Sequence, residues 1–517
     1  MASGFIVKRN QYYDSVFLMG VNSRLSSIDG VRKTAVLMAS EKNKELLQGF
    51  DIACPELDAA QPNDLVVAVM AETDQIVEDV LANVDHAFIA PEGKERRNSV
   101  PTLEDALAQQ PQANIVSISI PGEYAAREAH KALDAGLHAF IFSSNVSLED
   151  ELALKQKAVE NNLLVMGPDC GTSLIGGTGL GFTNVVRQGS IGAIGASGTG
   201  LQEFTSQIHH AGSGISHAIG IGTNDVSDKI GGLTAFTTLI ALEANQATEV
   251  IAFVSKPVGP KMLEKFENKF KACKKPIVCC FLGAKELPPG HTNLVYTRTI
   301  DDAVIAALKY TDQNTLPVSV LSLTLEEKDR IEQEKGKWDK KQKYLRGIFA
   351  GGTFCYQSQQ ILKDEGIAVY SDSPLAPEYK LADPENSFSH SIVDMGSEYF
   401  TVGKPHPMID GFLRKQRIKT ESLDPQVAVI FLDFILGYNA SPDPVGELID
   451  AIEQAKRNAH ARNAHLTFVA SVCGTELDPQ DMDLQIQLLE DQGVIVFTSN
   501  AKAARFCANL VSKERDQ

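Results

Sequence analysis

The chain has 517 residues, 43% of them hydrophobic, and a formal net charge of -18 from 48 basic and 66 acidic side chains. At about 150 residues per domain, this length predicts roughly three or four domains of globular α/β type. The acidic balance excludes nucleic acid and anionic membrane as expected partners, but not a small anionic substrate bound locally. The 8 Cys show no metal-type spacing, no apolar run reaches about 18 residues, and no signal-peptide pattern is present, so we expect a cytoplasmic protein without a metal site.

Residues 1–95 predict a small N-terminal α/β domain. Its predicted strands are the apolar runs Phe5–Val7, Thr34–Met38 and Asp64–Val69, and Thr73 precedes an apolar pattern with helical spacing. No Gly-rich phosphate loop follows its first strand. The polar stretch from Pro91 to Pro101 reads as a linker.

Residues 100–188 alternate between predicted strands and helices. The strands end near Ile120, Phe142 and Met166, with short loops and helices between them, which indicates a parallel sheet. Ligands of such sheets sit beyond the carboxyl ends of the strands. Pro121, Gly122 and Asn145 follow these ends, so we expect them to face a ligand.

Residues 189–316 form a second α/β segment that opens on a glycine-rich turn. A short apolar strand is followed by Ser197-Gly198-Thr199, and a helical pattern starts there. The first amides of a helix lack partners within it and carry partial positive charge, which suits a phosphate or carboxylate. The alternative is an ordinary Ser/Thr N-cap with a glycine in the turn. Asn224 and Lys256 follow later strands of the segment, where Lys256 would neutralise a phosphate.

Residues 346–517 repeat the plan of residues 189–316, after a charged segment at 317–345 that we expect to be a connecting helix. Gly352-Thr353 echoes the first helix start, so one anion would fit between two facing helix N-termini. Later in this segment, Lys404 and His406 lie in a proline-rich loop that corresponds to the loop holding Asn224. Because prolines fix its backbone, His406 is a candidate hydrogen-bond donor or acid/base, and Lys404 a candidate phosphate ligand. The alternative is a turn with a solvated histidine.

Three motifs point to a known family. They are Gly-Pro-Asp-Cys-Gly-Thr-Ser from Gly167, Gly-Ala-Ser-Gly-Thr-Gly from Gly195, and Gly-Lys-Pro-His-Pro-Met-Ile-Asp from Gly403. Residues 100–316 resemble the α subunit of succinyl-CoA synthetase and the NDP-forming acyl-CoA synthetases, and the whole chain resembles the FdrA branch. The resemblance implies a Rossmann-like CoA-binding domain at 100–188 and two flavodoxin-like, succinyl-CoA-synthetase-type (ligase-CoA) domains at 189–316 and 346–517. It makes Pro121, Gly122 and Asn145 candidate CoA ligands.

In that family a phosphate passes from nucleotide to a histidine and then to a carboxylate, and CoA attacks the acyl phosphate. This chain differs in three places. The nearest counterpart of the phosphohistidine loop, around His291, lacks the small residues after the histidine; no ATP-grasp domain is present; and the N-terminal Gly-rich CoA loop is missing. Nucleotide chemistry would therefore need a partner.

Three functions remain open from the sequence. The first is an FdrA-type acyl-CoA synthetase subunit that acts through an acyl phosphate held at helix N-termini, with CoA and phosphate as ligands. The second is a subunit of an oxamate-type carbamoyltransferase using carbamoyl phosphate, to which FdrA-like proteins have been linked. The third is a non-catalytic, anion-sensing scaffold. The resemblance implies other enzyme subunits as partners and an oligomer.

Overall fold

The computed structural model describes residues 2–11, 13, 15–26, 28, 30–39, 43–44, 55–88, 100–256, 258–284, 288–311, 322–401 and 404–512. These residues group into two compact units, one of residues 1–101 with 398–406 and one of residues 102–397 with 407–517. The predicted linker from Pro91 to Pro101 lies largely outside the described residues. No helix in the described ranges is long and apolar enough to span a bilayer.

The first unit is built on a three-stranded antiparallel sheet in the order β1-β3-β2. Every residue of β3 except Met70 is buried, because successive side chains of this central strand point into two hydrophobic clusters on opposite faces of the sheet. Thr73 caps α4 by accepting a hydrogen bond from Ile76 N, as the sequence predicts. The elements are β1 (Ala2–Lys8), α1 (Ser15–Ser26), β2 (Val31–Met38), α3 (Pro55–Asp58), β3 (Leu65–Ala71), α4 (Asp74–Ala82), α5 (Val84–Phe88) and, from the later segment, α15 (Glu398–Thr401).

The second unit begins with a small parallel sheet in the order β4-β5-β6. Helices α7 and α8 cover one face of it, and their alanines and leucines form a core with Ile118 and Ile141. Ser147 caps α8 by accepting from Asp150 N at 3.1 Å. The elements are α6 (Leu103–Gln109), β4 (Ile115–Ile118), α7 (Gly122–Asp134), β5 (His138–Ile141), α8 (Leu148–Glu160) and β6 (Val165–Met166).

A seven-stranded sheet follows in the order β13-β12-β11-β9-β10-β7-β8. Its strands β9 to β13 are parallel, whereas β7 and β8 form an antiparallel hairpin at one edge. The elements are β7 (Thr172–Ile175), β8 (Thr178–Gly181), β9 (Gln188–Gly195), α9 (Gly198–His210), β10 (Ile215–Gly220), η2 (Thr223–Val226), α10 (Leu233–Ala244), β11 (Val250–Ser255), α11 (Pro260–Ala272), β12 (Ile277–Phe281), β13 (Leu294–Thr297) and α12 (Ile300–Leu308).

A six-stranded parallel sheet completes the unit in the order β15-β16-β14-β17-β18-β19. The elements are α13 (Leu325–Lys335), β14 (Tyr344–Phe349), α14 (Gly352–Asp364), β15 (Val369–Tyr370), η4 (Pro377–Tyr379), β16 (His390–Asp394), α16 (Phe412–Glu421), β17 (Val427–Ile435), α17 (Gly446–Ala461), β18 (Thr467–Cys473), α18 (Met482–Asp491), β19 (Ile495–Phe497) and α19 (Asn500–Val511).

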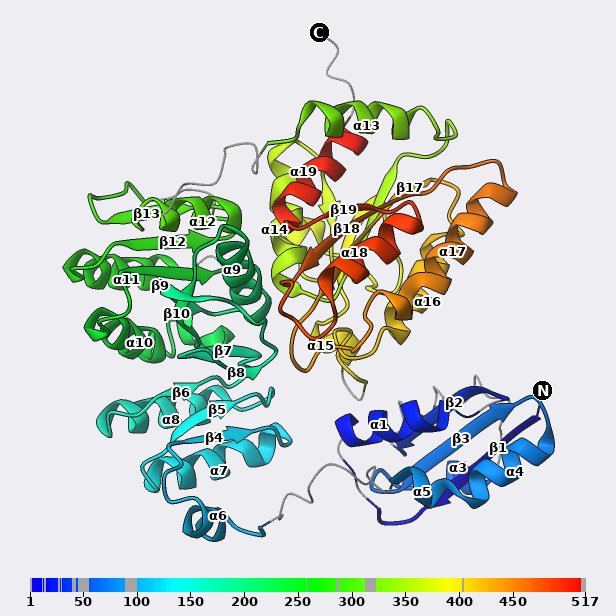
Figure 1. Ribbon diagram of the computed structural model, residues 1–517, viewed down its shortest axis with the longest axis horizontal. Helices are drawn as coiled ribbons and strands as arrows, with labels where there is room; N and C mark the ends of the chain where they lie inside the picture. Colours follow the sequence, from blue (N-terminus) through cyan, green and yellow to red (C-terminus); the bar gives the residue numbers. More distant parts are fainter. Residues whose placement is uncertain are drawn as a thin grey trace. The chain divides into compact units, whose positions relative to one another are not determined.

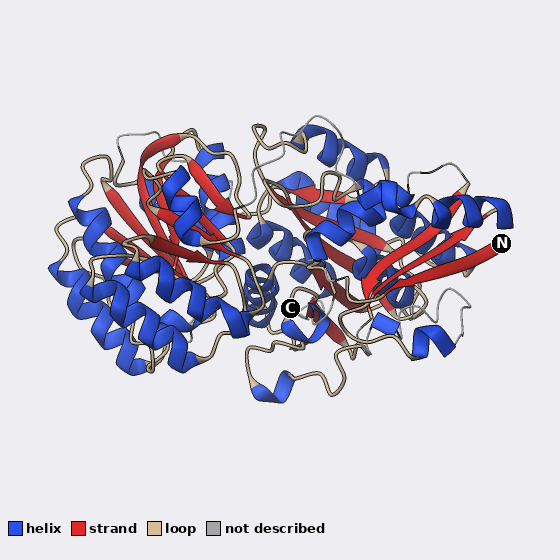
Figure 2. Ribbon diagram, turned by 90° about the horizontal axis from the view of Figure 1, so that it is seen from below, coloured by secondary structure: helices blue, strands red, loops and turns tan. Residues whose placement is uncertain are grey.

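The two larger sheets share one strand order, which supports the predicted duplication. Strands β13-β12-β11-β9-β10 correspond to β19-β18-β17-β14-β16, and α9 and α14 each follow the central strand of their sheet. Helices lie on both faces of each sheet (Figures 1 and 2). The α/β class with a Rossmann-like sheet and two flavodoxin-like domains is thus confirmed.

Two local features differ from the sequence expectation. The hairpin β7–β8, in the segment assigned to the first Rossmann-like domain, pairs with β10 of the next sheet. The predicted connecting helix is α13, with a Thr324 capping box; most of its residues are exposed, as a charged connecting helix requires, but Ile331 and Glu334 are buried. These two side chains explain the difference, since Glu334 accepts from His465 Nε2 and Thr467 Oγ1 and so ties the helix to β18.

Candidate functional site

The two predicted helix starts lie against each other. Ser197 is the N-cap of α9, and its Oγ shares a hydrogen bond with Thr353 Oγ1 in the first turn of α14. A Cβ atom placed on Gly200 would lie 3.3 Å from both Thr353 Cγ2 and Val254 Cγ1. The glycine therefore allows the two helices to approach closely at their N-terminal ends. The structure thus brings Ser197, Gly198 and Thr199 together with Gly352 and Thr353.

The N-terminal amides of α9 are available to a ligand. The Ser197 side chain makes no capping bond to them, and within the described ranges the amides of Gly198, Thr199 and Gly200 face no protein acceptor. Ser197, Gly198 and Thr199 are each partly exposed. Unpaired amides at the positive end of a helix favour an anion.

The start of α14 is different because a carboxylate of the protein already occupies part of it. Asp433, near the carboxyl end of β17, is fully buried and accepts from Ala350 N at 2.8 Å and Gly351 N at 2.7 Å. Arg414 forms an ion pair with this carboxylate at 3.1 Å. The amides of Ala350 and Gly351, just before α14, are thus already hydrogen-bonded within the protein. The first turn of α14 lies against α9.

A second carboxylate lies beside the first turn of α14. Asp394 ends β16, and a Cβ atom placed on Gly352 would lie 2.6 Å from its Oδ2. Burial, with a smaller contribution from Asp372, raises the pKa of Asp394 to about 7, and the Lys256 ammonium opposes this rise. Lys256 follows β11, and its Nζ lies 5.3 Å from the centre of the Tyr356 ring on α14. Lys256 therefore extends from the first duplicated segment to α14 of the second. A residue that binds a phosphate between α9 and α14 needs this reach.

Asn224 is engaged in a contact within the protein. Its Nδ2 donates to Glu151 Oε2 at 3.1 Å. Next to it, Asp225 is fully buried and pairs with the buried Lys155 at 2.8 Å, which also contacts Glu151 at 2.8 Å and donates to the Ile221 carbonyl. This cluster joins α8 to the loop after β10, and the role of Asn224 as a phosphate ligand stays a prediction.

Lys404 and His406 belong to the first compact unit, whereas the two helix starts belong to the second. Burial lowers the pKa of His406 to about 4, so its imidazole is neutral near pH 7. A neutral imidazole donates one hydrogen bond or accepts a proton, but it is not an acid at that pH. The assignment of both residues to the site stays a prediction.

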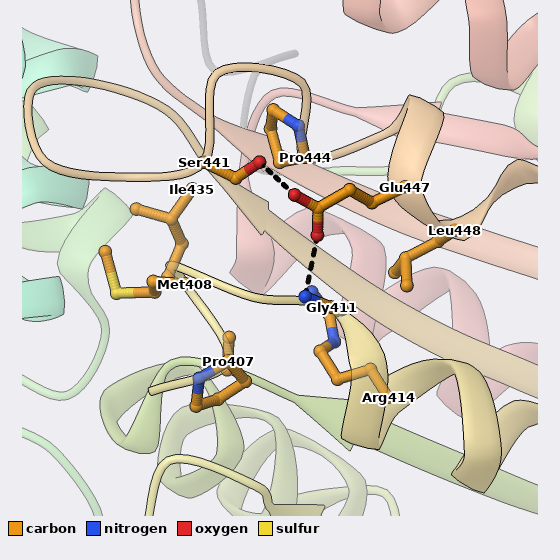
Figure 3. A pocket seen from close by; sticks show the side chains of 10 residues that line it. Pro407, Met408, Gly411, Arg414, Ile435, Ser441, Pro444, Glu447 and Leu448 are labelled. Atoms are coloured by element: carbon orange, nitrogen blue, oxygen red, sulfur yellow. Dashed lines mark hydrogen bonds between the residues drawn. The ribbon is translucent and has the colours of Figure 1, made fainter. Parts of the chain in front are cut away.

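The loop that follows His406 borders a cavity of about 10 Å³, room for about one water molecule (Figure 3). Pro407 and Met408 line it, together with Glu447 from α17. Glu447 accepts from Gly411 N at 2.7 Å and from Ser441 Oγ, as the dashed lines in Figure 3 mark. This cavity is too small for a substrate, so the contacts are structural.

The predicted CoA ligands meet at the carboxyl edge of the small sheet. A Cβ atom on Gly122, the first residue of α7, would lie 2.2 Å from the Ser144 carbonyl oxygen and 2.7 Å from that of Asn145. Asn145 has a φ of 61°, and Pro121 is the N-cap of α7. The sequence correctly places these residues at one edge, and CoA binding there stays a prediction.

Sequence reasoning missed Asp394 and Asp433. Asp433 could have been noticed, because it is the only charged residue in the apolar run of β17. Asp394 gave no comparable signal, since an acidic residue at a strand end is common in surface turns. Among the described residues, no group of three or more His, Cys, Asp or Glu side chains is arranged to hold a metal ion. Burial raises the pKa of the Cys170 thiol to about 11, so Cys170 is a protonated thiol at neutral pH.

Three family models match the chain. The model described as CoA-ligase matches residues 348–510, the CoA binding domain matches residues 186–283, and "AllF, heavy metal-associated domain" matches residues 1–105. The CoA binding match thus covers the segment around β9 to β12, whereas the family resemblance implied CoA binding at residues 100–188. The domain boundaries given there stay a prediction.

Similar proteins fall in two groups. The chain is 39% identical, over 99% of both chains, to the uncharacterized protein YahF of Escherichia coli (strain K12). It is 29% identical to succinate–CoA ligase [ADP-forming] subunit alpha 1 of Archaeoglobus fulgidus, over 37% of this chain and 64% of the relative. It is 26% identical to the ADP-forming sulfoacetate–CoA ligase subunit SqwL of Acholeplasma sp, over 33% of this chain and 59% of the relative. The chain thus spans less than two thirds of each of these ligase subunits.

Solved structures give weaker likenesses. The dinucleotide-forming acetyl-coenzyme A synthetase 1 of Ca. Korarchaeum cryptofilum, in complex with phosphate and ADP, matches with a TM-score of 0.27 and 16% identity, over 77% of this chain and 82% of that one. The ATP citrate lyase of Methanothrix soehngenii, in complex with citrate and coenzyme A, matches with a TM-score of 0.31 and 20% identity, over 40% and 37%.

Proposed function

The chain belongs to the same family as YahF, and on that premise we propose that it is a subunit of an acyl-CoA synthetase whose anion site lies between the N-termini of α9 and α14. The matches to a CoA-ligase domain and a CoA binding domain support the proposal. Its motifs favour the FdrA branch of this superfamily. Other subunits would supply the nucleotide chemistry, since the ligase relatives of the chain are themselves named as subunits.

One observation carries the proposal: the contact between Ser197 and Thr353 at the start of two helices from the two duplicated segments. Two helix N-termini that converge place partial positive charge on both sides of one point. Unpaired amides of α9 and two hydroxyl groups supply hydrogen-bond donors there, and Lys256 supplies a positive charge nearby. This combination suits the phosphate group of an acyl phosphate.

The reaction in this proposal joins an acyl phosphate to the thiol of CoA. The sulfur attacks the acyl carbon, the bond between that carbon and the phosphate oxygen breaks, and inorganic phosphate leaves with the electron pair. The helix amides and Lys256 stabilise the charge that develops on the leaving phosphate. The thiol proton must be taken up as the sulfur attacks. Asp394, with a pKa of about 7, is suited to take it up.

The test is a titration of thermal stability with phosphate, CoA, ADP and carbamoyl phosphate in parallel. At about 100 times its dissociation constant, a ligand stabilises the fold by about 2.7 kcal/mol. We expect phosphate and CoA each to raise Tm. The double variant Ser197→Ala with Thr353→Val should lose the phosphate shift. The control Thr237→Val removes a hydroxyl on α10 whose hydrogen bond, among the described residues, goes to the Leu233 carbonyl of the same helix, and it should keep the shift.

Each other outcome favours a different function. A shift with carbamoyl phosphate and none with CoA would replace the synthetase by the carbamoyltransferase. If the double variant still binds phosphate, the anion site does not lie between the two helices. Phosphate binding without acyl transfer in the presence of the partner subunits would leave the anion-sensing scaffold.

A further inference from the structure

The second compact unit contains a pocket of about 480 Å³ that the proposed function does not use. It lies where the face of the small sheet not covered by α7 and α8 meets β7, β8, β10 and α10. The lining extends along the strands, from His138 at the start of β5 to Met166, the last residue of β6, and to Ile219 of β10. Among the described residues, none at the starts of α9 and α14 lines the pocket. The pocket is therefore a separate site.

Most of the lining is apolar, with Leu164, Met166 and Ile219 among the side chains, and no Lys, Arg, Asp or Glu is among the described residues that line it. A pocket of this size, apolar and with a few polar groups, is typical of small-molecule sites. A buried carboxylate or ammonium on the ligand would find no opposite charge here, which is costly. The ligand is therefore expected to be neutral.

The two histidines in the lining present hydrogen-bond donors to the pocket. His138 Nδ1 accepts from Leu164 N at 3.0 Å, and His217 Nδ1 accepts from Gly176 N at 3.1 Å. An imidazole whose Nδ1 accepts a hydrogen bond carries its hydrogen on Nε2. Burial lowers the pKa of both histidines, in agreement with this neutral form.

Two donors in the lining face each other. Asn245 Oδ1 accepts from Ala247 N at 2.9 Å, so its Nδ2 is the atom that lies 3.2 Å from His217 Nε2. In the tautomer whose Nδ1 accepts from Gly176 N, both nitrogens carry hydrogen, so neither offers the other an acceptor. An acceptor oxygen on a ligand would satisfy both. Thr238 adds a third group, because it is 1% exposed and its Oγ1 has no partner within the described residues.

We propose that this pocket binds a neutral, largely apolar molecule with a carbonyl oxygen, such as a ketone, ester or amide, and that His217, Asn245 and Thr238 hold the oxygen. The proposal does not depend on the acyl-CoA synthetase function. A net hydrogen bond contributes modestly, so the apolar body of the ligand provides most of the affinity and the oxygen sets its orientation.

The experiment is isothermal titration of the full chain with three compounds of similar shape. Acetophenone has a neutral carbonyl, benzoate has a carboxylate, and ethylbenzene has no acceptor. We expect acetophenone to bind, ethylbenzene to bind about two- to tenfold more weakly, and benzoate at least about tenfold more weakly. No binding of acetophenone, or equal binding of either other compound, would overturn the proposal.

Variants of α10 locate the binding. Ala241 is exposed and lines the pocket, so Ala241→Phe should fill its mouth and abolish acetophenone binding. Its neighbour Ile240 is 63% exposed and is not part of the lining, so Ile240→Phe should bind like the native chain. Thr238→Val keeps the shape of the side chain and should weaken binding by about two- to tenfold. Acetophenone binding that is unchanged in both Ala241→Phe and Thr238→Val would place it elsewhere and contradict the proposal.

Discussion

At the scale of the residue, Lys155 shows how much one buried charge contributes to the stability of the fold. Its ammonium is 1% exposed and contacts two carboxylates, Glu151 and Asp225, at 2.8 Å each. Lys155→Met would leave both carboxylates buried without a counter-charge, so we expect a loss of about 3–5 kcal/mol in the free energy of unfolding. Urea denaturation of the two proteins measures it.

The matched control is Lys271, which pairs with Glu267 at the same i,i+4 spacing on α11 but is 40% exposed. Lys271→Met should cost less than about 1 kcal/mol. Equal losses in the two variants would mean that the buried cluster adds nothing beyond an ordinary surface pair.

Asp394 leads to a prediction about pH. Its pKa of about 7 in the fold lies above the usual 3.8, so the folded chain holds a proton that the unfolded chain releases. The stabilisation linked to this proton is complete below about pH 3.8 and disappears as pH rises to about 7, with a slope of up to about 1.4 kcal/mol per pH unit. Asp394→Asn removes this slope, so it should gain stability relative to the native chain between pH 5 and pH 7.

Urea denaturation at several pH values checks this prediction. Glu203, whose pKa burial also raises to about 7, serves as a comparison. Glu203→Gln must leave the Asp394 slope in place. A stability difference between Asp394→Asn and the native chain that does not change with pH would contradict the assignment.

The residues of the candidate site differ in how far the sequence could predict them. Ser197 and Thr353 were predictable because a strand, a glycine turn and a helical pattern are all local signals. That the two helix starts face each other was an inference from the duplication, and the hydrogen bond between Ser197 and Thr353 agrees with it. Asp394 and Asp433 were not found, because their roles depend on burial and on amides that are remote in sequence.

At the scale of the element, the hairpin β7–β8 shows the limit of pattern reading. Its strands are short, and Gly176 and Gly177 form the turn with φ of 56° and 85°. Two glycines between short apolar runs are a hairpin signal that could have been recognised. Its pairing with β10 could not, since no local pattern specifies which sheet a hairpin joins.

The packing of this hairpin against β10 requires a glycine at position 220. A Cβ atom on Gly220 would lie 2.2 Å from the Thr172 carbonyl oxygen and 2.4 Å from Cys170 Sγ. Gly220→Ala should therefore push β7 away from β10 and cost about 1–3 kcal/mol. At Gly171 the nearest atom would be 3.9 Å away, so Gly171→Ala should change stability by less than about 0.5 kcal/mol. Thermal unfolding compares them, and equal Tm values would contradict the steric argument.

At the scale of the whole molecule, the chain has two compact units with separate cores. We expect calorimetry to resolve two transitions, since separate cores can unfold separately. Leu65 is fully buried in the core of the first unit, and Leu65→Ala opens a cavity there. It should lower the Tm of one transition, with a loss of about 2–5 kcal/mol in the free energy of unfolding of that unit.

Leu239 is a buried residue of α10 in the core of the second unit, so Leu239→Ala should lower the Tm of the other transition only. Phosphate should raise the Tm of the same transition whose Tm Leu239→Ala lowers, because both helix starts belong to that unit. A single transition that both variants move equally would contradict the division.

The hydrogen bond between Ser197 and Thr353 joins residues that are 156 positions apart in one chain. A contact within a chain forms at an effective concentration that the connecting segment sets, and it does not weaken when the protein is diluted. A site assembled from two separate polypeptides would weaken on dilution by mass action. The affinity for phosphate should therefore be the same at nanomolar and at micromolar protein concentration. The reason is that both halves of the site belong to one polypeptide.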